Sequence, residues 1–63
     1  MTPGELLAEL QNLRQEGFDD ATLLAVVKKK TLAVPLGTED MVAWKRAGLP
    51  EEIIRAAVEL PVR

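Results

Sequence analysis

Three pairs of adjacent carboxylates are the residues of this chain whose type could support acid–base chemistry or hold a cation. They are Asp19-Asp20, Glu39-Asp40 and Glu51-Glu52. Each pair lies at the start of a predicted helix, where negative charge stabilises the positive end of the helix dipole. Neighbouring residues on a helix also point in different directions, so the two carboxylates of a pair do not converge on one atom. We interpret all three pairs as structural.

The usual nucleophiles and bases do not occur in the sequence. It contains no serine, histidine or cysteine, the residue types that most often act in covalent and acid–base catalysis. Thiolate and imidazole metal ligands and disulfides are excluded for the same reason. We therefore expect a protein that is not an enzyme and that uses no metal or other cofactor.

Five of the eight basic residues gather at the ends of two predicted helices: Lys28, Lys29, Lys30, Lys45 and Arg46. If the two helix ends lie on one side of the fold, these residues form a basic patch that could contact phosphates. Against this, the net charge is −2, and acidic residues at the helix turns would face the DNA backbone. A solvated surface that matches the helix dipoles is the simpler explanation, and nucleic-acid binding is the second functional hypothesis.

Four predicted helices position these charges. Apolar residues recur at helical spacing over approximately 3–16, 20–30, 38–47 and 50–60. The pattern predicts an all-α fold: a single domain over 1–63 with four short helices in two hairpins.

Capping chemistry sets the helix boundaries. Thr2, Pro3 and Glu5 have the spacing of a capping box with proline at the first helical position. Gly17 and Gly48 can adopt the left-handed conformation that ends a helix. The later helices have capping or first-turn residues at their starts, which are Asp19 or Asp20, Thr38, and Pro50.

The two glycine turns are related by a shift of the chain by 31 residues. The shift aligns Gly17 with Gly48, and Phe18 with Leu49. It also aligns apolar residues before and after each turn. Two explanations stay open: an internal structural repeat, or two ordinary helical hairpins that share the same boundary signals.

The connection between the hairpins, 31–37, is unusually apolar for a loop. Pro35 prevents the helix from continuing, while Leu32, Val34 and Leu36 alternate as in a strand. A strand here would have nothing in the chain to pair with. Our first interpretation is a loop that covers the core. The alternative is an exposed apolar rim for a partner, or an edge that pairs two chains.

Two aromatic side chains are candidates either for the core or for contact with a partner. Trp44 shares a helical face with Met41, and Phe18 follows directly after the first glycine turn. We expect both rings to pack mainly in the core, with contact to a partner as the alternative.

Size and composition limit the remaining possibilities. A core of 63 residues rarely supplies more than about 3–5 kcal/mol, so a partner or a second copy would help to stabilise it. No apolar run approaches the length of a membrane span, and the first residues do not resemble a signal peptide. We expect a cytoplasmic protein that does not contact membranes.

Part of the chain, residues 5–47, resembles ubiquitin-associated (UBA-like) domains. The resemblance lies in Leu10, Leu13 and Glu16-Gly17-Phe18, and in the stretch Gly37-Thr38-Glu39-Asp40-Met41-Val42-Ala43-Trp44. It implies binding of a folded partner through Gly17, Phe18 and the end of the third helix. Residues 47–54 are similar to short helical hairpins of small bacterial proteins of unassigned role.

These observations favour a non-enzymatic protein–protein interaction module that binds another protein or a second copy of itself. The predicted contact residues are Phe18, Leu32, Val34, Leu36 and Trp44. A further alternative is a structural subunit of a larger assembly.

Overall fold

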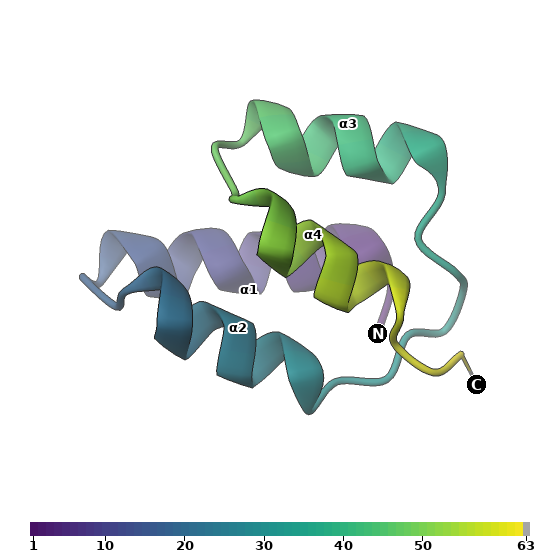
Figure 1. Ribbon diagram of the computed structural model, residues 1–63, viewed down its shortest axis with the longest axis horizontal. Coiled ribbons are helices and arrows are strands. Elements are labelled where there is room, and N and C mark those ends of the chain that lie inside the picture. Colours follow the sequence, from purple (N-terminus) through teal and green to yellow (C-terminus); the bar gives the residue numbers. More distant parts are fainter. Residues whose placement is uncertain (63) are drawn as a thin grey trace.

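The computed structural model describes residues 1–62 and has four α-helices in that range (Figure 1). They are α1 (Pro3–Gln15), α2 (Asp20–Lys28), α3 (Thr38–Arg46) and α4 (Glu51–Val58). The all-α, four-helix prediction is confirmed. The second helix of each hairpin ends two residues earlier than expected, as α2 stops at Lys28 and α4 at Val58.

Hydrogen bonds at the helix starts explain the first two boundaries. The Thr2 hydroxyl accepts from the Glu5 N–H at 3.2 Å, and the Glu5 carboxylate accepts from the Thr2 N–H at 2.9 Å. This bond from the Thr2 backbone lowers the pKa of Glu5 below its ordinary value. Asp19 is the cap of α2, and its carboxylate accepts from the Thr22 N–H at 2.9 Å.

The starts of α3 and α4 differ from the sequence prediction. The capping residue of α3 is Gly37 rather than Thr38, and the Asp40 carboxylate reaches back to accept from the Gly37 N–H at 3.0 Å. Pro50 precedes α4 as its cap and makes no side-chain capping bond. At the start of α3, the Asp40 carboxylate thus makes the side-chain capping bond that was expected from the Thr38 hydroxyl.

The four helices alternate in direction and form two hairpins, α1–α2 and α3–α4 (Figure 1). Each helix packs against two others, in the order α1, α2, α4, α3 around the core. The most extensive packing joins α2 to α4, one helix from each hairpin. Both glycine turns consequently lie at the same end of the molecule, opposite the two chain ends.

The core is entirely apolar in the described part of the chain. Trp44 is its largest side chain and is 1% exposed, which confirms the expectation that it packs inside. The other buried apolar residues are Leu6, Leu10, Leu23, Val27, Leu32, Leu36, Leu49, Ile53, Ile54, Ala57 and Leu60. Every helix and the connection between the hairpins therefore contribute to one core.

The connection between α2 and α3 pairs with both ends of the chain. Leu32 forms an isolated parallel bridge with Val62, and its N–H donates to the Pro61 carbonyl at 3.0 Å. The neighbouring Ala33 N–H donates to the Met1 carbonyl at 2.7 Å. The expectation that an extended segment here has nothing to pair with is wrong, because its partners are the two chain ends.

Candidate functional site

The two glycine turns have the same backbone geometry. Gly17 and Gly48 have φ values of 97° and 89°. At the first turn the Gly17 N–H donates to the Arg14 carbonyl at 3.0 Å, and the Phe18 N–H to the Leu13 carbonyl at 3.2 Å.

At the second turn the equivalent bonds have the same lengths. The Gly48 N–H donates to the Lys45 carbonyl at 3.0 Å, and the Leu49 N–H to the Trp44 carbonyl at 3.2 Å. Both turns are Schellman motifs, in which two bonds satisfy the last carbonyls of a helix. The shift by 31 residues thus relates the two backbones bond for bond at the turns.

The apolar residue after each glycine distinguishes the turns. Leu49 is 3% exposed and belongs to the core, whereas Phe18 is 48% exposed. The expectation that the Phe18 ring closes the core is therefore wrong. The reason is geometric: α1 has 13 residues and α3 has 9, a difference of about 6 Å of helix. The first turn consequently extends beyond the second (Figure 1).

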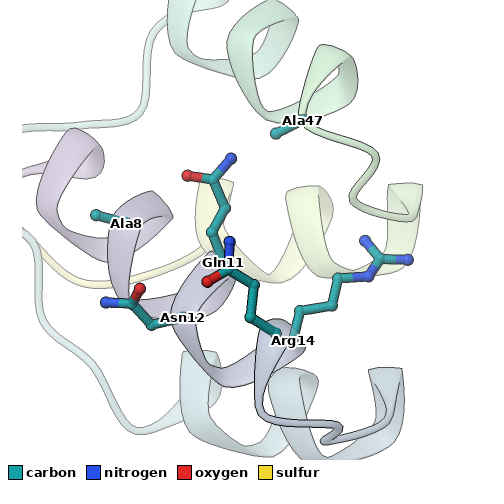
Figure 2. A pocket seen from close by; sticks show the side chains of 6 residues that line it. Ala8, Gln11, Asn12, Arg14 and Ala47 are labelled. Carbon is teal, nitrogen blue, oxygen red and sulfur yellow. The ribbon is translucent and has the colours of Figure 1, made fainter.

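Arg14 links the two turns. Its guanidinium Nη1 donates to the Gly48 carbonyl at 2.5 Å, and its Nη2 lies 3.8 Å from an Asp20 carboxylate oxygen. Figure 2 shows the side chain extending from α1 toward the segment that leads into α4. One cation thus bonds the second turn and lies near the helix start that follows the first.

A polar groove lies beside Arg14, between α1 and the end of α3 (Figure 2). Its volume is about 420 Å³, and it is lined by Ala8, Gln11, Asn12, Arg14, Gln15 and Ala47. Gln11 points toward the end of α3 that carries Ala47. The sequence analysis did not identify this groove; the signal in the sequence is the helical spacing of Gln11, Asn12 and Gln15, which places their amides on one face of α1.

The predicted contact residues of the inter-hairpin connection mostly face inward. Leu32 is 1% and Leu36 is 9% exposed, so the loop covers the core as the first interpretation held. Val34 is half exposed. Of the five predicted contact residues, Phe18 and Val34 are thus accessible, and contact with Leu32, Leu36 or Trp44 would require opening the core.

The basic residues do not form one patch. The end of α2, with Lys28, Lys29 and Lys30, lies at the opposite end of the molecule from the end of α3, with Lys45 and Arg46 (Figure 1). The assumption that the two helix ends lie on one side is wrong, because consecutive antiparallel helices end at opposite poles.

Two of these cations also form ion pairs. Lys30 Nζ lies 3.2 Å from a Glu9 carboxylate oxygen, and Lys45 Nζ lies 3.4 Å from a Glu51 carboxylate oxygen. The first pair connects the end of α2 to α1. The second joins α3 to the start of α4.

The acidic pairs occupy helix starts, in agreement with their interpretation as structural. Asp19 caps α2, and Thr22, first through its side chain and then through its backbone N–H, lowers the pKa of that carboxyl. Among residues 1–62, no group of three or more potential acidic ligands could hold a metal ion.

A second, more apolar groove lies between α3 and α4. Its volume is about 450 Å³, and its lining consists of Thr38, Met41, Val42, Lys45, Arg46 and Ile54. Val42 is 46% exposed, Met41 is partly buried and Ile54 is buried. The sequence contained one signal for exposed apolar surface on α3. Val42 is apolar but lies outside the helical face shared by Met41 and Trp44, so it is not part of the buried stripe.

The comparisons with known proteins produced no match. No protein-family model, curated protein or solved structure matches the chain. Within the described range, the helices are too short and too polar to cross a membrane.

Proposed function

We propose that this chain is a small, non-enzymatic module that binds another protein, or a second copy of itself, through the turn that presents Phe18. The observation that carries the proposal is the contrast between Phe18 and Leu49. The backbone is the same at both turns, yet only one of the two apolar side chains is used by the core. A half-exposed phenylalanine has a large apolar surface to bury against a partner.

The surroundings of Phe18 support a contact role. The turn extends beyond the rest of the molecule at the end away from the chain termini (Figure 1). The resemblance to UBA-like domains implies partner binding at the same two residues, Gly17 and Phe18. Since the chain contains no cysteine, a reducing compartment such as the cytoplasm suits it.

The proposal is tested by replacing Phe18 with the photo-crosslinking analogue p-benzoylphenylalanine, which keeps an aromatic ring at the turn. The matched control carries the analogue at Lys29, an exposed position at the far end of α2. We expect irradiation of cells that contain the protein to yield a discrete crosslinked species from position 18 and none from position 29.

Light scattering on the purified chain shows whether the partner is a second copy. Phe18→Ser should abolish association with the partner identified by crosslinking, measured on the purified proteins, while the far-ultraviolet circular dichroism stays helical. A chain that is monomeric at all concentrations and gives equal crosslinking from both positions would contradict the proposal.

A further inference from the structure

The α3–α4 groove has the dimensions and the surface chemistry to receive one bulky apolar side chain. Its volume of about 450 Å³ is open to solvent on one side of α3. Ile54 is its most buried apolar residue, and Met41 and Val42 supply accessible apolar surface. The accessible surface that lines the groove is almost entirely apolar, so filling it costs little desolvation of polar groups.

The charged side chains that line this groove are positive, and the nearest carboxylates belong to Glu51, which pairs with Lys45, and Glu39, which lines an adjoining hollow that shares Val42 and Arg46. Lys45 and Arg46 line it, and no carboxylate does. Lys45 pairs with Glu51, but both side chains are more than 60% exposed, and such a pair is weak enough to exchange for another carboxylate. Arg46 pairs with no carboxylate among residues 1–62. The two cations in the groove lining contrast with the chain's net charge of −2.

The turn that presents Phe18 has the complementary chemistry. Its ring is half exposed and is flanked by the carboxylates of Glu16, Asp19 and Asp20, all of them exposed. An aromatic side chain surrounded by acidic residues therefore extends from one end of the molecule. A separate part of its surface is an apolar groove with two cations at its edge.

We propose that the Phe18 turn of one copy of this chain inserts into the α3–α4 groove of a second copy. Phe18 would fill the space beside Val42 and Ile54, and the flanking carboxylates would approach Lys45 and Arg46. The two contact surfaces are different, so the interface is heterologous and a pair of copies keeps one free turn and one free groove. The inference rests on the proposed function and specifies its partner as another molecule of the same chain.

Two substitutions separate the two halves of the interface. Phe18→Ser removes the inserted side chain and leaves the groove intact, while Val42→Asp blocks the groove and leaves the turn intact. Both residues are about half exposed, so each variant should fold. Circular dichroism and Trp44 fluorescence check this before the association is measured.

We expect the mean mass of the unaltered chain, measured by light scattering, to rise with concentration beyond that of a dimer. Each single variant should stay monomeric, with association weakened more than tenfold. An equimolar mixture of the two variants should form a 1:1 dimer that does not grow, because only one competent turn and one competent groove remain.

The charges are tested by Arg46→Glu, which should also reduce association. Mixing it with Glu16→Lys should recover part of the lost affinity. A chain that is monomeric up to about 1 mM, or a mixture of Phe18→Ser and Val42→Asp that shows no dimer, overturns the inference. If position 18 still crosslinks to a different protein, the proposed function survives that result; if it crosslinks to nothing, both fail.

Discussion

The turn at Gly17 and the turn at Gly48 are built from the same hydrogen bonds but face different surroundings. In both, glycine with positive φ ends a helix, and the next residue is apolar. Leu49 is buried where α3 and α4 meet the core, while Phe18 lies on the longer α1–α2 hairpin, past the end of the core. The comparison shows that a local motif determines the path of the backbone, whereas helix length determines whether its apolar side chain is buried.

The starts of the following helices differ as well. Asp19 caps α2 with its carboxylate, whereas Pro50 has no side chain that can accept a hydrogen bond. The first turn is therefore acidic and exposed, and the second is stabilised mainly by burial. Substitutions at equivalent positions should separate these two contributions.

The largest expected difference is between Leu49→Ala and Phe18→Ala. Removing buried Leu49 should lower the free energy of unfolding by about 2–5 kcal/mol. This is comparable with the total of about 3–5 kcal/mol for a core of this size, so the variant should be largely unfolded. Phe18→Ala should cost about 1 kcal/mol or less, because the ring is half exposed. Urea denaturation followed by circular dichroism measures both, and equal losses would refute the distinction.

Replacing the glycines should have equal effects at the two turns. Gly17→Ala and Gly48→Ala each force a Cβ into the left-handed region, at a cost of about 1–2 kcal/mol. A Cβ at Gly17 would meet no atom within 4 Å, and at Gly48 only Arg14 Nη1 at 3.8 Å. The control Gly4→Ala lies in α1 with open space around it and should stabilise by about 0.5–1 kcal/mol. Thermal denaturation of the three variants tests this, and clearly unequal costs at 17 and 48 would show that the turns are not equivalent.

Removing the link between the turns should have a smaller effect. Arg14→Met deletes the bond to the Gly48 carbonyl and keeps the aliphatic stem, so we expect a loss of about 0.5–1 kcal/mol for this partly exposed group. The matched control Arg46→Met removes a cation that has no ion-pair partner among residues 1–62 and should change stability by less than about 0.5 kcal/mol. Chemical denaturation at low protein concentration measures both, and a control as damaging as Arg14→Met would argue against a specific link.

The smallest effect concerns pH. The pKa of Asp19 is lowered in the folded chain, so its contribution to stability is complete above the ordinary value of 3.8 and is lost as the pH falls through the lower folded value. The Thr22 amide resonance should shift as the Asp19 carboxylate titrates. The Ile53 amide, at the equivalent position of α4, should show no such shift, because Pro50 has no side chain that can cap the helix. Asp19→Asn keeps a capping oxygen and should abolish the titration of Thr22. An unchanged titration in that variant would assign it to another carboxylate.

Much of the fold was predictable from sequence because its boundaries depend on short-range chemistry. The capping box at Thr2 and the glycines at 17 and 48 act within a single turn of helix, so four helices in two hairpins could be inferred. The burial of Trp44 followed from its helical spacing to Met41. These features need no knowledge of how the hairpins pack.

The features that the sequence did not reveal depend on distant parts of the chain. The exposure of Phe18 depends on how far α1 extends beyond the packed helices. The bridge from Leu32 to Val62 spans about half of the chain, and no local pattern indicates it. The α3–α4 groove depends on how two helices pack and on which face of α3 carries Val42. Most of the candidate interface was therefore accessible only from the structure.

The pairing of both chain ends with the same loop has a consequence for rearranging the protein. Met1 bonds to Ala33 and Val62 pairs with Leu32, so the two ends are separated by two strand spacings, or about 10 Å. A linker of roughly four residues should join them into a circular chain. New ends could then be opened within the 48–50 turn, giving a circular permutant that keeps all four helices and leaves the Phe18 turn uncut.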